Sequence, residues 1–437
     1  MSAILEQLFH LRENRTSIRR EFIGGLTTFL AMSYILAVNP ELLGSAGMSK
    51  TAVFTATVLA AIVGCLLMGL VANFPVALAP GMGLNAFFTY TVVQEWHIPW
   101  QTALAGVFVA GILFILLTLS KLRDKLINMI PSALKYAVSA GIGLFIAFSG
   151  LQTSGIIVAS KSNAVALGNL HNPTVLLAIF GIIVGVMLVT ANVTGGIFWG
   201  MFITAVVGMI FGIIPLPTGI ISGVPSVQPI FGQALTHITD INSFQMIIVI
   251  LTFFIIGLFD TSGTLVGVAT EAGMVNHETG EVKGVGKALF SGALATTIGA
   301  IFGTSPTTAY VESTSGVAVG ARTGLSSVFV AILFAVAAFF SPILTVITSA
   351  VTASALIIVG ILMLSNVQYI DWTKFEIAVP AFFTMIMMLL TYSISEGLAV
   401  GFIFYPITMS VKGRWREVNA LMWVMMVVFI LYFAFVA

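Results

Sequence analysis

The sequence has 437 residues, of which 59% are hydrophobic and only 8% are charged, and its net charge is +1. Soluble domains carry about 25% charged residues, so this composition excludes a soluble domain and indicates a polytopic helical membrane protein. The balanced charge gives no reason to expect a nucleic-acid partner, and a single cysteine, Cys65, excludes a disulfide framework.

Apolar runs long enough to cross a membrane recur along the whole chain, seven in each half. The first half contains runs at 23–38, 52–71, 74–93, 102–119, 131–151, 175–189 and 196–214. The second half contains runs at 244–259, 285–302, 307–319, 327–346, 349–364, 376–390 and 398–411. We therefore predict an all-α polytopic membrane protein with about 14 transmembrane helices. A further apolar run, 420–436, is long enough to span the membrane or to lie in it.

The runs divide the chain into five predicted parts. They are a cytoplasmic N-terminal segment (1–22), a first repeat (23–214), an external linker (215–243), a second repeat (244–411), and a cytoplasmic basic turn followed by the extra apolar segment (412–437). With the N-terminus inside, 15 of the 17 basic residues fall in or beside cytoplasmic loops, and the exceptions are Lys50 and Lys161. The positive-inside rule therefore favours a multi-pass protein of the cell membrane with a cytoplasmic N-terminus.

Seven spans in each half give the halves opposite orientations, as an inverted repeat requires. Weak internal similarity supports this, because I-P-S-A at 130–133 with Gly143 reappears as I-T-S-A at 347–350 with Gly360 at the same offset. In each half the third span contains a proline followed by small residues: A-P-G-M-G-L-N-A-F-F at 79–88, and S-P-T-T-A-Y-V-E at 305–312. Proline and glycine disfavour a continuous helix. Unwound backbone at membrane depth must be buried in protein or line a cavity, so we expect the two breaks to face each other.

Two carboxylates accompany these breaks. Asp260 directly follows the apolar run 244–259, within the motif G-L-F-D-T-S-G-T. Glu312 lies inside the second break. A carboxylate at membrane depth indicates a binding or proton-relay site, and broken helices at the midplane bind substrate in secondary transporters. We expect Asp260 and Glu312 to lie on either side of one cavity. The structural alternative, an interhelical hydrogen bond, applies most to Asn85.

Three motifs together resemble the AzgA-like purine permeases of the nucleobase–cation symporter-2 family, over about residues 19–416. They are A-P-G-M-G-L-N-A-F-F, F-D-T-S-G-T and T-S-P-T-T-A-Y-V-E-S-T-S-G-V-A-V-G-A-R-T-G-L. The resemblance implies a 7+7 inverted repeat with core and gate domains, in which helices 3 and 10 are broken by short extended segments. It also implies that Asp260 and Glu312 are the carboxylates that bind substrate and proton. Gly83 and Asn85 correspond to the family's site positions in helix 3. Asp260 and Val311, where the uracil and xanthine branches usually have Glu and Gly, place the chain nearer the purine branch.

The residue chemistry suits a neutral planar base. A carboxylate accepts N–H bonds from such an edge, and Asn85 offers both a donor and an acceptor. Hydroxyls at Thr264 and Thr308 add further partners, and the rings of Phe87, Phe88, Phe259 and Tyr310 are candidates for flat contacts. The predicted substrate-binding set is Asp260, Glu312, Asn85, Gly83, Thr264, Thr308, Tyr310 and Val311. Two nearby carboxylates disfavour each other's charged form, so Asp260 and Glu312 are also the proton-coupling candidates.

The sequence therefore predicts a secondary active transporter that imports adenine, guanine or hypoxanthine by proton symport with alternating access. The alternatives are a transporter of another nucleobase (uracil or xanthine), or of a small anion, on the same scaffold, and sodium in place of the proton. An enzyme is not expected, because no metal-binding spacing or G-x-S-x-G motif lies in the spans. The expected partners are a purine base and the bilayer, with a homodimer left open, and no cofactor or metal beyond the coupling proton.

Overall fold

The computed structural model describes residues 2–120, 131–160, 164–217, 219–274, 284–391 and 393–435, without the side chains of a few of these, Phe259 among them. The loop lysines and arginine at 121, 123, 125, 161 and 283, used above for the topology, lie outside these ranges.

The first half contains α1 (Ser2–Phe9), α2 (Ile18–Met32), α3 (Ile35–Ser45), α4 (Lys50–Leu67), η1 (Met68–Ala72), β1 (Leu78–Pro80), α5 (Met82–Ala86), η2 (Phe87–Glu95), α6 (Trp100–Leu119), α8 (Ser132–Thr153), β2 (Ile157–Ser160), β3 (Ala164–Leu167), α9 (Pro173–Thr190) and α10 (Gly196–Ile210).

The second half contains α11 (Gln233–Thr236), η3 (Ile238–Asp240), α12 (Phe244–Glu271), α13 (Val285–Phe302), β4 (Thr307–Ala309), α14 (Ser313–Ala318), α15 (Gly324–Ala337), η4 (Ala338–Val346), α16 (Ser349–Leu364), η5 (Ser365–Tyr369), α17 (Phe375–Leu390), α18 (Ile394–Val411), η6 (Trp415–Glu417) and α19 (Ala420–Phe435). Within the described ranges, nine helices are long and apolar enough to cross a membrane. Together with the shorter helices α10, α17 and α18 and the two broken segments, they confirm the fourteen predicted spans.

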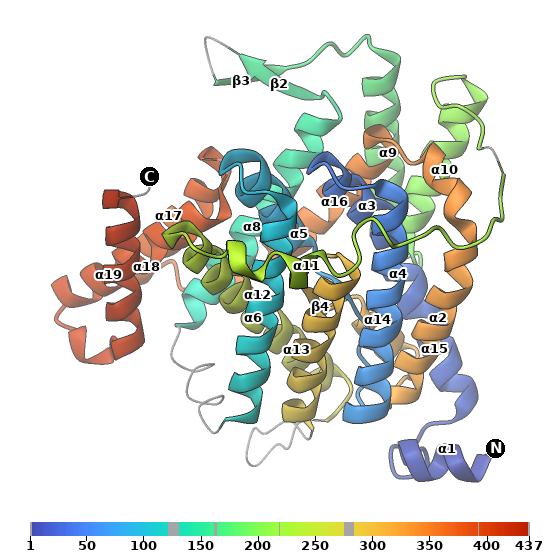
Figure 1. Ribbon diagram of the computed structural model, residues 1–437, viewed down its shortest axis with the longest axis horizontal. Coiled ribbons are helices and arrows are strands. Elements are labelled where there is room, and N and C mark those ends of the chain that lie inside the picture. Colours follow the sequence, from blue (N-terminus) through green and yellow to red (C-terminus); the bar gives the residue numbers. More distant parts are fainter. Residues whose placement is uncertain are drawn as a thin grey trace.

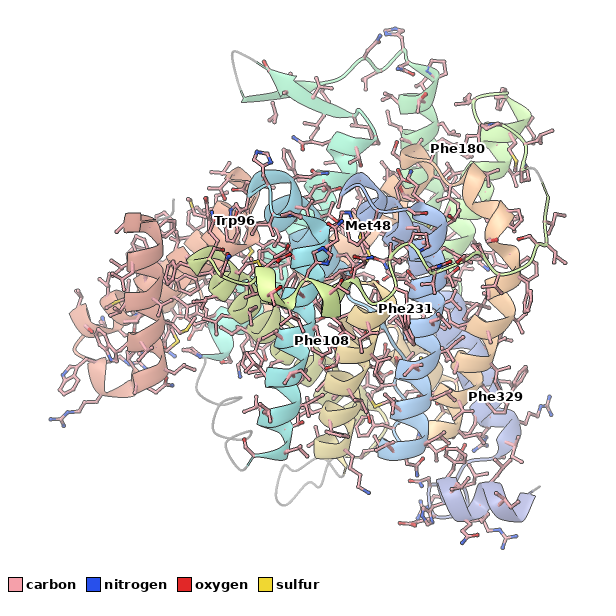
Figure 2. All side chains as sticks on the ribbon, in the orientation of Figure 1. Met48, Trp96, Phe108, Phe180, Phe231 and Phe329 are labelled. Atoms are coloured by element: carbon pink, nitrogen blue, oxygen red, sulfur yellow. The ribbon has the colours of Figure 1, made fainter. Side chains whose placement is uncertain are left out.

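The helices pack as two groups. In the first, which we call the core group, α13 packs against α4 and α6, α12 packs against α6, and α15 packs against α2 and α4. In the second, the gate group, α8 packs against α16 and α17, α9 packs against α10 and α16, and α17 packs against α18. Figure 1 shows α1 at one end of the molecule and the β2–β3 hairpin at the other. Figure 2 likewise shows Phe329 toward the α1 end, with Met48 and Trp96 toward the opposite end.

Strands β1 and β4 meet where both third spans are broken. They pair antiparallel, with Leu78 opposite Ala309 and Pro80 opposite Thr307. Two further backbone bonds extend the contact, from Gly81 N to Pro306 O (2.9 Å) and from Tyr310 N to Ala77 O (3.0 Å). Proline has no N–H, and each span is extended beside its proline before its helix begins, so its backbone groups are satisfied on the other strand. The predicted facing of the two breaks is confirmed.

The two halves also meet at equivalent glycines. A Cβ on Gly143 of α8 would lie 2.6 Å from Gly360 O, and a Cβ on Gly360 of α16 would lie 2.5 Å from Gly143 O. Each backbone thus occupies the space that a side chain on the other helix would need. The internal sequence repeat relates these two glycines. Equivalent positions of the two repeats are therefore in contact where α8 crosses α16.

Two spans differ from the predictions in their boundaries, and one further element was not predicted. Helix α12 continues through Asp260 to Glu271, so the apolar run does not end at Phe259. The hydroxyl residues after Asp260 lower the hydropathy, but a helix satisfies their backbone groups within the segment itself, which the membrane interior favours. The first span begins at Ile18 and is interrupted between Met32 and Ile35, with Tyr34 in the interruption. The hairpin β2–β3 was not predicted.

Glu21 lies in the part of α2 that precedes the predicted start of the first span. We placed it in the cytoplasmic segment 1–22, yet it is fully buried in α2. Its carboxylate accepts hydrogen bonds from the backbone N–H groups of Arg322 (2.9 Å) and Ser326 (3.2 Å) at the start of α15, and from the Thr16 hydroxyl (2.8 Å). A helix start has backbone N–H groups without partners, so Glu21 caps α15 and ties the two halves together.

Candidate functional site

One cavity brings the two carboxylates together. Asp260 projects from α12 and Glu312 directly precedes α14, and both line a cavity of about 2070 Å³ that lies between the core and gate groups and reaches toward the α1 end. Thr308 of β4 hydrogen-bonds to the Asp260 side chain, and Asp260 lies close enough to Glu312 for the two charges to interact. Two acids from segments far apart in sequence therefore act within one electrostatic environment.

Tyr34 completes the surroundings of Glu312. Its hydroxyl donates to Glu312 Oε1 at 2.7 Å, and its ring lies 6.5 Å from that of Tyr310 with a tilt of 45°. The side chain is 2% exposed and lines the cavity. Sequence reasoning missed Tyr34, although a tyrosine hydroxyl in the middle of an apolar span needs a polar partner and could have drawn attention to it.

Most of the predicted residues line this cavity, with Val311 exposed to it. They are Asp260, Glu312, Gly83, Thr264, Thr308, Tyr310 and Val311. Tyr310 is almost fully buried, and its hydroxyl donates to Pro80 O at 2.6 Å, which links the end of β4 to β1. The polar face of Tyr310 therefore holds the strands together, while its ring contributes to the cavity wall.

Asn85 lies elsewhere in this conformation. It is fully buried and is not among the residues that line the cavity. Its Oδ1 accepts a hydrogen bond from Ser305, and its Nδ2 has no partner among the described groups. This placement fits the alternative of a bond between spans rather than direct contact with substrate.

The phenylalanine candidates have other roles. Phe87 and Phe88 are fully buried and pack against Phe253, with ring centroids 5.1 and 6.4 Å away. Neither offers a free ring face to a ligand, so that prediction was wrong. The side chain of Phe259 lies outside the described part of the chain.

Two glycines in the first break allow this arrangement. A Cβ on Gly81 would lie 2.5 Å from Thr308 Oγ1, the hydroxyl that bonds to Asp260, so a side chain there would displace Thr308. A Cβ on Gly83 would lie 2.7 Å from Ile142 Cγ2 of α8, which belongs to the gate group. Gly81 therefore shapes the site, and Gly83 lets the core group approach the gate group closely.

No group of three or more His, Cys, Asp or Glu residues that could hold a metal ion occurs within the described ranges. Around Asp260 and Glu312, the cavity wall offers two carboxylates, hydroxyls, tyrosine rings and the strand β4, which pairs with β1. Such a set can accept and donate hydrogen bonds to a neutral polar solute and can exchange a proton with it or with water.

Residues 19–400 match the sequence model of the Permease family (Xan_ur_permease). The chain belongs to this family. It is 56% identical over 440 residues to the guanine/hypoxanthine permease PbuG of Bacillus subtilis (strain 168), a match that covers 99% of this chain and 100% of PbuG. It is also 42% identical over 418 residues to the adenine permease AdeQ of Escherichia coli (strain K12), covering 96% of this chain and 93% of AdeQ. The chain is thus a permease and not an enzyme, as the motifs predicted.

Solved structures support the same fold. The transmembrane domain of the cyanobacterial bicarbonate transporter BicA superimposes with a TM-score of 0.64 at 17% identity, covering 88% of this chain and 97% of that domain. SLC26A9 gives a TM-score of 0.63 at 11% identity, covering 94% of this chain and 69% of that chain. The predicted 7+7 inverted-repeat fold is confirmed, and at this level of identity the likeness concerns the fold alone.

Proposed function

We propose that this permease imports purine nucleobases (guanine, hypoxanthine or adenine) across the cell membrane by proton symport. The observation that carries the proposal is the placement of Asp260 and Glu312 on one cavity, next to the crossing of β1 and β4. The names of the full-length relatives PbuG and AdeQ support a purine as the solute. A neutral purine presents N–H and acceptor groups along its edges, which the carboxylates and the nearby hydroxyls can pair with.

In the proposed binding mode, Glu312 accepts an N–H bond from the base edge while Tyr34 holds its other oxygen. Thr264 and Thr308 supply further hydrogen bonds, Tyr310 provides a flat contact, and Gly83 and Val311 shape the pocket wall. We assign the coupling proton to Asp260, because Glu312 lies nearby and disfavours a second negative charge, and Glu312 itself is assigned to the base edge. No cofactor or metal takes part.

Transport follows from motion of the core group against the gate group. In this proposal the chain divides into a cytoplasmic N-terminal segment (1–22, into the end of which α2 extends), a first repeat (23–214), an external linker (215–243), a second repeat (244–411) and a cytoplasmic C-terminal part (412–437). The cavity reaches the α1 end, so under this proposed orientation the conformation is open to the cytoplasm. Binding at a break shared by both halves of an inverted repeat is the arrangement that alternating access requires.

A small anion is the alternative raised by the scaffold, since BicA is a bicarbonate transporter of the same fold. Two carboxylates flanking the proposed site oppose it, because each would repel an anion at short range. A transporter of uracil or xanthine is a closer alternative, and only a direct comparison of solutes separates it from a transporter of adenine, guanine or hypoxanthine.

Uptake of radiolabelled adenine, guanine and hypoxanthine into cells lacking their own purine transport tests the proposal. We expect at least one of these three bases to accumulate, to be displaced by unlabelled adenine, guanine or hypoxanthine better than by uracil or xanthine, and to stop accumulating when an uncoupler removes the proton gradient. Uptake driven by sodium with the proton gradient gone, or uptake of bicarbonate and no purine, would overturn it. Cells that express the double variant Asp260→Asn, Glu312→Gln serve as the control for uptake that does not depend on the two carboxylates.

A further inference from the structure

The cavity extends far beyond the two carboxylates. Its volume of about 2070 Å³ exceeds the roughly 300–1,000 Å³ of most small-molecule sites. Toward the α1 end it is lined by His10 and Lys287 on the core side and by Tyr136 and Tyr369 on the gate side. A single purine therefore fills only a fraction of it, and a solute moving between Glu312 and the α1 end contacts the gate wall on the way.

Most of this gate wall is apolar, with Ile142, Val359, Leu362, Met363 and Phe402 along it. Polar side chains of α8 and η5 interrupt it: Ser132, Lys135, Ser139, Ser365 and Asn366. The Asn366 Nδ2 group donates to Ser139 Oγ at 2.9 Å and to Met363 O at 3.0 Å. A carbonyl oxygen can only accept, so Met363 fixes which end of the amide is nitrogen.

This orientation leaves two complementary groups side by side. Among the described residues, no donor contacts Asn366 Oδ1 and no acceptor takes the Ser139 hydroxyl hydrogen. Both residues are only partly buried and both line the cavity. An adjacent donor and acceptor match the edge of a nitrogen heterocycle, where acceptor and N–H groups alternate.

An aromatic pair lies one helical turn from these groups. Tyr136 precedes Ser139 by three residues in α8, and Tyr369 follows Asn366 by three residues in η5, so each ring shares a face with its polar neighbour. The two rings lie 5.2 Å apart with a tilt of 39°, and Tyr369 is 61% exposed. Phe375 is nearby in sequence and even more exposed, at 78%, but does not line the cavity.

We propose that Tyr136, Ser139, Asn366 and Tyr369 form an entrance patch, a second and weaker binding subsite for planar nitrogen heterocycles. The base stacks on the exposed face of Tyr369 while its edge bonds to Ser139 and Asn366. The proposal rests on the proposed purine transport and adds a subsite on the gate group, apart from Glu312 and Asp260. Because stacking on an aromatic ring tolerates any base, the patch accepts each transported purine and leaves selection to the inner site.

A solute reaches the patch from the face that bears α1. Loss of the patch should therefore change the KM measured from that side of the membrane only. The test uses right-side-out and everted vesicles from purine-transport-deficient cells, with radiolabelled hypoxanthine and an N-terminal tag whose protease accessibility reports the α1 face. In Tyr369→Ala, the KM measured from the α1 face should rise about three- to tenfold, at the weak end of what base stacking contributes. The KM from the other face should stay within about twofold of the wild type.

Two control variants and a second test variant complete the experiment. Tyr369→Phe keeps the stacking ring and should retain wild-type KM at both faces. Phe375→Ala removes a more exposed aromatic outside the cavity and should also leave both values unchanged. Ser139→Ala removes the open donor without touching the Asn366 bond to Met363, and should raise the KM at the α1 face about two- to fivefold, as expected for one hydrogen bond.

An unchanged KM at the α1 face in both Tyr369→Ala and Ser139→Ala would overturn the entrance patch. So would an equal rise at both faces, or the same rise in Phe375→Ala, because each of these indicates a general structural effect. A wild-type protein that moves no purine in either vesicle type would instead refute the proposed function. The two failures are therefore distinguishable.

Discussion

At the scale of single residues, the bond between Tyr34 and Glu312 decides what the carboxylate can offer a ligand. The phenol occupies Oε1 at 2.7 Å, which leaves Oε2 as the oxygen best placed to accept from a base. A carboxylate held on one side presents its second oxygen in a fixed direction, and such preorganisation favours binding. The bond joins residues 278 positions apart, so no local pattern in the sequence could show it.

Tyr34→Phe tests this arrangement, because it removes the hydroxyl and keeps the ring. Hydrogen bonds to charged groups contribute about 1.5–3 kcal/mol, so kcat/KM for purine uptake should fall about tenfold or more. Tyr405→Phe is the matched control, since Tyr405 is a buried phenol of α18 that does not line the cavity. Wild-type kinetics in Tyr34→Phe, at normal membrane abundance, would show that the bond does not position Glu312.

Glu312→Gln and Asp260→Asn separate the roles of the two acids. In Glu312→Gln, Tyr34 can donate to the amide oxygen, which turns the NH₂ group toward the cavity as a donor where the wild type accepts. We expect the order of unlabelled purines in a competition assay to change while some accumulation against a gradient remains. In Asp260→Asn we expect the order to persist while accumulation is lost.

The assignment fails if the two variants exchange these outcomes. Wild-type selectivity and accumulation in Glu312→Gln, with normal surface expression, would show that Glu312 has neither role. Measuring both variants at the same external pH keeps the driving force equal, so a difference between them reports on the side chains.

At the scale of elements, the breaks in the third span of each half were predictable from the sequence. The continuation of α12 past Asp260 was not. Pro80 and Pro306 lack an N–H, so the breaks at β1 and β4 follow from local chemistry, and their pairing follows from the need to satisfy the freed backbone. The extension of α12 past Asp260 depends on neighbouring helices, which hydropathy along the chain does not report. The contributions of Gly81 and Glu21 likewise depend on contacts with β4 and α15, in the other half of the chain.

The crossing of α8 and α16 is a sensitive contact between elements. In Gly143→Ala, the new methyl group would lie 2.6 Å from Gly360 O, a backbone atom that cannot rotate away. Overpacking of this kind typically costs about 1–3 kcal/mol, so the detergent-solubilised protein should unfold at a lower temperature. Gly257→Ala in α12 is the control, because its Cβ would meet only Leu84 Cδ1 at an ordinary 3.8 Å. Equal unfolding temperatures for the two variants would contradict the close crossing.

At the scale of the whole molecule, the cavity lies between the two groups of helices and not inside either one. The core group carries β1, β4, Asp260 and Glu312, and the gate group supplies the opposite wall. The number and order of the spans followed from composition and charge, because lipid imposes length and polarity on every helix. The division into two groups required the packing between helices, for which the sequence offers only the internal repeat as a guide.

The contact between Gly143 and Gly360 has a thermodynamic consequence. Equivalent residues of two oppositely oriented repeats can touch only on the pseudo-twofold axis that relates them. If the repeats exchange their conformations across this axis, the protein becomes open at the opposite end while its contacts keep the same kinds of partners. The close backbone contact between Gly143 and Gly360 then persists in both end states, so this crossing favours neither of them. A modest difference in solute or proton concentration is enough to set the direction of net flow.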